Sequence, residues 1–229
     1  MEILTSLKRK ARIILRNFKD YREHTPFCCR KREIPELPYN HRLIQPILPS
    51  ATFTEKKYNL NYAAELFGQY IIRPGEVFSF WNILGNPNKL KGSRCIRNNK
   101  IKIERGGGLC QAAGIIYHLS ILCGLKIVER YNHSIDLYGD GPRACPIGFD
   151  ATVCYGYKDL RIYNNTKAIL RFQLSITNDE LHAELQSSTP LIEREIAIEK
   201  KVINNLIEVK TFYADTGELI TNNIYKTIE

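Results

Sequence analysis

The sequence contains the stretch Gly106-Gly107-Gly108-Leu109-Cys110-Gln111, directly before an apolar segment that ends at Gly124. Residues 109–123 have the composition of a helix, and a glycine after the last turn is typical of a helix end. Three glycines in front of a helix allow unusual backbone dihedrals and let a ligand approach the backbone closely. We therefore predict a tight turn that places Cys110 in the first turn of a helix.

A thiol at a helix start has a distinct chemistry. Unpaired N–H groups and a partial positive charge stabilise a thiolate there, so we expect a lowered pKa and a nucleophilic Cys110. The amides of Gly107 and Gly108 and the side chain of Gln111 are the candidates to bind a substrate oxygen or oxyanion. In the alternative interpretation, Cys110 is a small buried residue and Gln111 only covers the turn.

Length arithmetic supplies a partner for the thiol. The helix from Cys110 to Cys123 is ~21 Å long at about 1.5 Å per residue. A following strand from Lys126 to His133 is ~25 Å long at about 3.3 Å per residue. Because Gly124 reverses the chain, the strand returns to the start of the helix, and we expect His133 near Cys110.

A carboxylate completes the predicted site. Residues 151–155 are expected to form the next strand, and antiparallel pairing with residues 126–132 would place Asp150 beside His133. We therefore predict Cys110 as nucleophile, His133 as base and Asp150 as the residue that orients the base, as in a thiol hydrolase or acyltransferase. The chain order Cys, His, Asp is similar to that of transglutaminase-like cysteine enzymes.

Other uses of these side chains stay open. His133 could cap the end of a strand, and Asp150 could satisfy backbone N–H groups of the loop before it. The glycine turn could instead hold a carboxylate or phosphate in a protein without catalysis. A zinc site is the remaining rival, formed by Cys110, His133, Cys145 and Cys154. The paired spacings of structural zinc sites are missing, so we expect neither a metal nor another cofactor.

The positive charge is concentrated in the leader, residues 1–32. The leader has ten Lys or Arg against three acidic residues, so it carries +7 of the total of +9. Apolar residues at helical spacing within residues 3–20 predict a basic amphipathic helix. Such a helix lies on anionic lipid headgroups or docks its apolar stripe on its own domain. We do not expect nucleic acid as a partner, because no reading motif accompanies the charge.

The rest of the chain predicts an α+β fold, in which a helix packs on an antiparallel sheet. We expect a helix at 59–70, a strand at 76–81, a hairpin at 94–104 around Asn98-Asn99 and a hairpin formed by 168–176 and 180–186. We divide the chain into three parts: a basic helix with a proline-rich connector (1–50), a central domain (51–176) and a β-rich extension (177–229).

The seven cysteines and the apolar pattern suggest a compartment. Seven is an odd number, no secretory signal is recognisable, and no apolar run is long enough to span a membrane. We therefore expect a cytoplasmic protein with reduced thiols. Contact of residues 1–32 with lipid would make it peripheral at the inner membrane face.

Several motifs, in this order, resemble the VanW family over about residues 57–176. They are Arg73-Pro74-Gly75-Glu76-Val77-Phe78-Ser79-Phe80, the glycine stretch 106–111, Arg130-Tyr131-Asn132-His133-Ser134, Asp150-Ala151-Thr152-Val153, Asp159-Leu160-Arg161 and Asn164-Asn165-Thr166. Family members with a second histidine have it two positions before the one matched by His133, where this chain has Tyr131. The resemblance implies a peptidoglycan-related peptide or small molecule as substrate and an accessory role in glycopeptide (vancomycin) resistance.

Overall fold

A computed structural model gives the architecture of the chain and describes residues 2–97, 100–136, 139 and 141–227. The helices within these ranges are α1 (Glu2–Arg22), α2 (Phe53–Phe67), α3 (Phe80–Leu84), the 3-10 helix η1 (Pro87–Lys89) and α4 (Leu109–Leu122). The strands up to the middle of the chain are β1 (Cys29–Arg30), β2 (Tyr39–Pro46), β3 (Tyr70–Ile71), β4 (Val77–Ser79), β5 (Gly92–Arg97), β6 (Lys100–Arg105) and β7 (Lys126–Glu129). Those that follow are β8 (Ile135–Asp136), β9 (Arg161–Tyr163), β10 (Leu170–Thr177), β11 (Glu180–Ser187), β12 (Ile196–Ile203), β13 (Leu206–Tyr213) and β14 (Leu219–Thr227).

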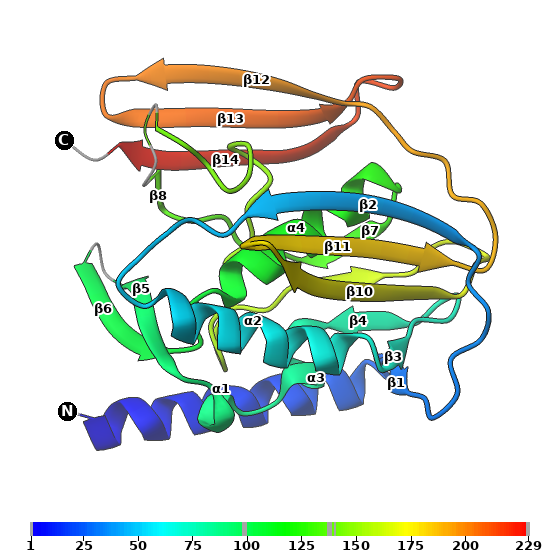
Figure 1. Cartoon of the computed structure of the whole chain (residues 1–229), viewed down its shortest axis with the longest axis horizontal. Helices are drawn as coiled ribbons and strands as arrows, with labels where there is room; N and C mark the ends of the chain where they lie inside the picture. The colour runs from blue at the N-terminus through cyan, green and yellow to red at the C-terminus, as the bar shows by residue number, and fades with distance from the viewer. Residues whose placement is uncertain (1, 98–99, 137–138, 140, 228–229) are drawn as a thin grey trace.

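The core lies between the antiparallel sheet β10-β11-β2 and the helices α2 and α4 (Figure 1). Along β11 the side chains alternate: Leu181, Ala183 and Leu185 are buried against the helices, whereas the residues between them are more exposed. This alternation is typical of an antiparallel sheet with one covered face. The predicted α+β class is thus confirmed.

A smaller antiparallel sheet, β4-β9-β7, lies at the end of α4. Gly124 has a φ of +65° after the last turn of α4, which reverses the chain into β7 as expected from the sequence. β7 pairs with β9, and in this pairing Ile127 of β7 lies opposite Ile162 of β9. This pairing positions the segment after β7, which carries His133.

The last part of the chain forms a third sheet, in the order β12-β13-β14-β8. It lies above the main body in Figure 1, and β8 joins it in parallel to β14. Ile207, Val209 and Tyr225 form a small buried cluster with Ile147 beneath it. The extension is therefore packed on the loop between β8 and β9.

Several sequence predictions are corrected by the structure. The helix expected at 59–70 begins earlier and ends at Phe67. The strand expected at 76–81 ends at Ser79, whose side-chain oxygen accepts a hydrogen bond from the Asn82 amide at 3.1 Å and so caps α3. Residues 151–155 form no strand, because the partner expected for them, β7, pairs with β9 instead.

The division of the chain into residues 1–50, 51–176 and 177–229 stays a prediction, and one sheet contains strands from all three parts. The sheet β10-β11-β2 contains β2 from residues 1–50, β10 chiefly from residues 51–176 and β11 from residues 177–229. The hairpin predicted at 94–104 is formed by β5 and β6, and its turn at Asn98-Asn99 lies outside the described residues. In the described part of the chain, no helix has both the length and the apolarity needed to cross a bilayer.

Candidate active site

The glycine stretch forms a tight turn between β6 and α4. Gly106 and Gly108 have φ angles of +92° and +96°, which side-chain-bearing residues rarely adopt. A Cβ atom at Gly108 would lie 2.8 Å from the Cγ of Lys56 on α2, so the turn also needs the close approach that glycine allows. The sequence prediction of a tight turn at this place is confirmed.

A buried asparagine, which sequence reasoning missed, holds this turn. The side chain of Asn59 on α2 donates hydrogen bonds to the carbonyls of Gly107 at 3.0 Å and Lys91 at 3.1 Å. Its oxygen accepts the Lys91 amide at 2.8 Å. An asparagine inside a helix carries no motif, so only the polar residue on an otherwise apolar face could have indicated this role.

Cys110 lies in the first turn of α4 and is partly exposed. Its thiol donates to the carbonyl of Val153 at 3.8 Å. In the same turn, the amide of Leu109 donates to Gly106, and those of Gln111 and Ala112 donate to Gly108. Among the described residues, the Cys110 amide has no such acceptor, so it is the first-turn N–H group best placed to bind an oxyanion at the sulfur.

The structure brings together the three side chains that the sequence singled out. His133 is near enough to the Cys110 thiol that the two side chains shift each other's pKa. On its other side, the His133 Nδ1 atom lies 2.6 Å from the Asp150 carboxylate, which also accepts the His133 backbone N–H at 2.7 Å. The predicted neighbourhood is therefore present, although the strand pairing that we invoked for Asp150 is wrong. The backbone reaches the same place as a loop, in which the Thr152 amide donates to the Tyr131 carbonyl at 2.7 Å.

Further side chains fix the carboxylate of Asp150. Arg130 donates to the backbone carbonyl of Asp150 at 2.8 Å and to the Oδ1 atom of its side chain at 3.1 Å. The hydroxyl of Tyr225 on β14 donates to the same Oδ1 atom at 2.6 Å. Arg130 is itself held over the ring of Tyr117 on α4, at 4.7 Å from the ring centre, and by the side chain of Asn223 on β14.

These supporting residues were missed for a simple reason. Arg130 belongs to a motif quoted above but received no role, and a hydrogen bond between residues 75 positions apart gives no local signal for Tyr225. The C-terminal extension thus contributes to the site.

The pKa values of Cys110, His133 and Asp150 are all shifted toward the charged form of each side chain. Burial tends to raise the pKa of the Cys110 thiol, but the hydrogen bond and the charge of His133 outweigh it and lower that pKa. Burial tends to lower the pKa of His133, but the hydrogen bonds to Asp150 and Cys110 raise it to about 10. Burial opposes the ionisation of Asp150, yet His133 and Arg130 lower its pKa to about 2. The site therefore favours a thiolate paired with an imidazolium.

Two other predicted site residues, Gln111 and Gly107, make hydrogen bonds within the fold. The side-chain amide of Gln111 donates to the Pro46 carbonyl on β2 at 2.9 Å, so this donor serves the contact between α4 and the sheet. Gly107 is buried, and its carbonyl is bound by Asn59. In the described ranges, no three His, Cys, Asp or Glu side chains are grouped so that they could hold a metal ion.

Fold and site together define a class: α+β proteins with a cysteine at a helix start, a histidine beside it and a buried carboxylate behind the histidine. Residues 55–186 match the profile of the family described as VanW like protein. This match covers more than half of the chain, which therefore belongs to the VanW family.

Two curated relatives are similar to about half of the chain. The vancomycin B-type resistance protein VanW of Enterococcus faecalis is 31% identical over 129 residues, which are 55% of this chain and 46% of that protein. The uncharacterized protein YoaR of Bacillus subtilis is 30% identical over 112 residues, which are 48% of this chain and 35% of that protein. The alignments thus span less than half the length of either relative. No solved structure matches the chain.

Proposed function

We propose that this chain is a cysteine-dependent hydrolase or acyltransferase that acts on a peptide or amide bond. The observation that carries the proposal is the grouping of Cys110, His133 and Asp150, in which His133 is hydrogen-bonded to Asp150, the pKa of the thiol is lowered and that of the imidazole is raised. A thiolate held ready beside a general acid is the arrangement that acyl transfer through sulfur requires. The order of the three residues along the chain is similar to that in transglutaminase-like enzymes, and we extend the analogy to the arrangement.

The first half of the proposed reaction forms a thioester. The Cys110 thiolate attacks the carbonyl carbon, and the carbonyl oxygen becomes an oxyanion that the Cys110 amide can stabilise. The carbon–nitrogen bond then breaks, and the His133 imidazolium gives its proton to the leaving amine. Asp150 accepts a hydrogen bond from Nδ1 throughout, which leaves the other ring nitrogen to exchange protons at the sulfur.

The second half releases the acyl group. Neutral His133 takes a proton from water, or from an acceptor amine, which attacks the thioester carbon. The carbon–sulfur bond breaks, and the thiolate and the imidazolium are restored. Water as acceptor gives hydrolysis and an amine gives transfer.

The proposed substrate is a peptidoglycan-related peptide or precursor. The support is membership in the VanW family together with the similarity to the Enterococcus faecalis vancomycin B-type resistance protein VanW. On this basis we propose an accessory role in glycopeptide resistance. We also propose a cytoplasmic location, because a thiolate nucleophile is active only while it stays reduced.

Selective alkylation tests the activated thiol. At about pH 6, iodoacetamide should label Cys110 faster than Cys154, because the pKa of Cys110 is lowered. Access alone predicts the opposite order, since Cys154 is exposed and Cys110 is only partly exposed. Peptide mass spectrometry follows each cysteine separately. The buried thiol of Cys123, whose pKa is raised to about 12 by burial, is the slow reference. Labelling of Cys154 ahead of Cys110, or a Cys110 rate that is the same in His133→Gln, would contradict the proposal.

A substrate test separates catalysis from binding alone. A panel of stem peptides and their amidated precursors is incubated with the wild type and with Cys110→Ser, and products are detected by mass spectrometry. Catalysis predicts products with the wild type only. If both proteins bind a peptide equally and neither yields a product, the site is a binding module that uses the helix start for a carboxylate.

A further inference from the structure

The N-terminal helix α1 is attached to the domain by its polar side. Arg16 donates to both carboxylate oxygens of Glu129 at 3.0 and 2.7 Å, and Arg161 donates to both oxygens of Asp20 at 2.6 and 2.8 Å. Glu129 ends β7 and Arg161 begins β9, so both ion pairs bind the helix to the smaller sheet β4-β9-β7. Ile13 packs beside Gly156 on the same side of α1.

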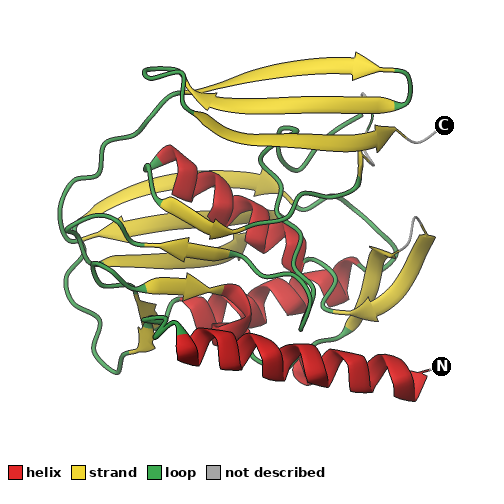
Figure 2. Ribbon diagram, turned by 180° about the vertical axis from the view of Figure 1, so that it is seen from behind, coloured by secondary structure: helices red, strands yellow, loops and turns green. Residues whose placement is uncertain are grey.

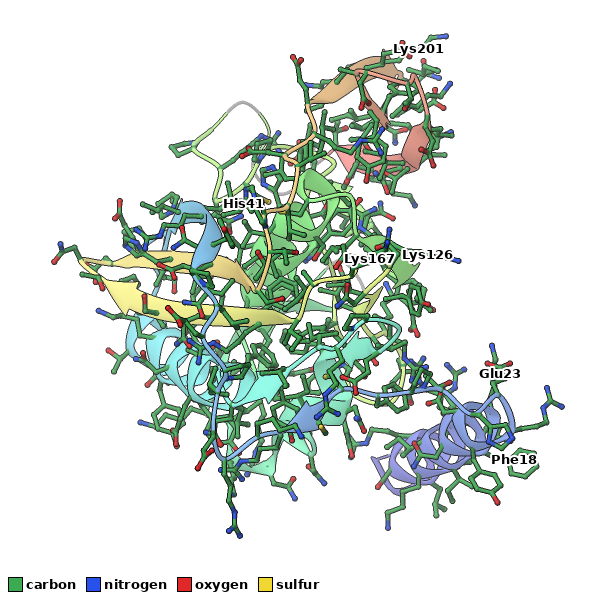
Figure 3. All side chains as sticks on the ribbon, turned by 90° about the vertical axis from the view of Figure 1, so that its right-hand side faces the viewer. Phe18, Glu23, His41, Lys126, Lys167 and Lys201 are labelled. Atoms are coloured by element: carbon green, nitrogen blue, oxygen red, sulfur yellow. The ribbon has the colours of Figure 1, made fainter. Side chains whose placement is uncertain are left out.

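The opposite side of α1 presents large apolar side chains to solvent. The exposed fractions of Leu7, Ile14, Leu15, Phe18 and Tyr21 lie between 57% and 78%. These residues recur at helical spacing and share one face, which we call the apolar face of α1. Figure 3 shows Phe18 on the side of α1 that points away from the body of the protein. The interpretation in which this stripe docks on its own domain is therefore wrong.

Basic residues border the apolar face on both flanks. At 100° per residue, Lys8 and Lys19 lie on one flank and Lys10 lies on the other, and Arg22 extends the face toward the end of the helix; all four are exposed. The acidic Asp20 points the other way, toward Arg161. The outer half of the helix therefore combines apolar side chains with positive charge.

We infer that the apolar face of α1 docks on the surface of an anionic lipid bilayer. Apolar side chains at the centre and lysines at the flanks match the acyl boundary and the headgroups of such a surface. The ion pairs Arg16–Glu129 and Asp20–Arg161 hold this face outward. The helix, which lies along one edge of the domain (Figure 2), thus meets the bilayer side-on with the domain behind it. The positive flanks favour an anionic lipid surface over a neutral one.

Vesicle co-sedimentation of the full chain tests the inference. The protein should bind vesicles of phosphatidylcholine with phosphatidylglycerol and should bind vesicles of phosphatidylcholine alone far less, and added salt should weaken the binding. The double variant Ile14→Ser/Phe18→Ser should bind at least about tenfold more weakly, because two large apolar side chains are lost from the contact. Ile192→Ser/Val202→Ser, at two exposed positions outside α1, is the matched control and should bind like the wild type.

Three outcomes would overturn the inference. One is equal vesicle binding by the two double variants. A second is a dimer in gel filtration that only Ile14→Ser/Phe18→Ser dissociates, since a second copy would then cover the face. A third is binding of duplex DNA in the absence of vesicle binding. Alkylation of Cys110 should be the same in all these proteins, so this test is independent of the proposed catalysis.

Discussion

Asp150 accepts two hydrogen bonds from His133, one from the ring Nδ1 atom at 2.6 Å and one from the backbone N–H at 2.7 Å. A single carboxylate oxygen thereby fixes both the position of the residue and the orientation of its ring. The other oxygen is bound by Arg130 and Tyr225, so the carboxylate cannot rotate without losing several partners. Asp150 is therefore the anchor on which the geometry of the site depends.

Replacing this anchor by its neutral isostere should change the basicity of the imidazole. In Asp150→Asn the amide oxygen can still accept the His133 backbone N–H, but the negative charge beside the ring is lost. We expect the pKa of His133 to fall from about 10 toward its ordinary value, and Cys110 to be alkylated more slowly. A histidine NMR titration of the wild type and the variant measures the change. An unchanged pKa of His133 would show that Asp150 does not set it.

The stability of the protein should depend on pH through the same pair. Because the pKa of His133 is raised to about 10 in the folded state, from 6.5, its pairing stabilises the fold fully below about pH 6.5. This contribution declines as the pH rises and is lost above about pH 10. The difference in unfolding free energy between the wild type and His133→Gln, from urea titrations, should thus be largest at acidic to neutral pH and shrink toward pH 10. A difference that grows with pH would contradict the pairing.

Tyr225 connects the C-terminal sheet with the site. Tyr225→Phe removes one hydrogen bond to a buried carboxylate, and we expect a loss of about 1.5–3 kcal/mol in unfolding free energy. The pKa of Asp150 should rise, because one donor to its ionised form is lost. The matched control is Tyr39→Phe at an exposed position on β2, where little change is expected. Equal effects of the two variants would mean that the Tyr225 hydroxyl does not support the site.

Gly108 is needed both for its backbone conformation and for its lack of a side chain. Gly217, with a φ of +69°, has nothing within 4 Å of an added Cβ, whereas at Gly108 the Cγ of Lys56 is 2.8 Å away. We expect Gly217→Ala to lower the unfolding free energy by about 1–2 kcal/mol from the dihedral alone. Gly108→Ala should lower it by about 1–3 kcal/mol more, from overpacking at the turn. Thermal unfolding compares the two, and a smaller effect at Gly108 would contradict the close approach.

The sequence predicted what local patterns determine. Periodic apolar residues identified α1 and α4, and the turn at Asn178-Asp179, where both residues have positive φ, identified the hairpin of β10 and β11. The nearness of Cys110 and His133 followed from lengths, because a helix and an extended return of similar length end at the same place. These inferences need only residues that are close in the sequence.

The sequence did not predict what distant residues determine. Residues 151–155 have the composition of a strand, but β9 occupies the place beside β7. The segment is instead a loop, in which the Thr152 amide donates to the Tyr131 carbonyl and Arg130 donates to the carbonyl of the preceding Asp150. Asn59 and Tyr225 act across 48 and 75 positions of sequence, respectively. For α1, the spacing of apolar residues predicted an amphipathic helix. Which of its sides faces outward is decided by the ion pairs Arg16–Glu129 and Asp20–Arg161, whose partners lie far away in the sequence.

The position of Tyr225 has a consequence for biosynthesis. Tyr225 lies 75 residues after Asp150, so a growing polypeptide exposes its thiol, imidazole and carboxylate to the cell well before β14 has left the ribosome. During that interval the carboxylate lacks one of its donors. The nascent chain therefore completes this constellation only when translation has passed β14, and a premature stop after residue 186 would yield a product that never completes it.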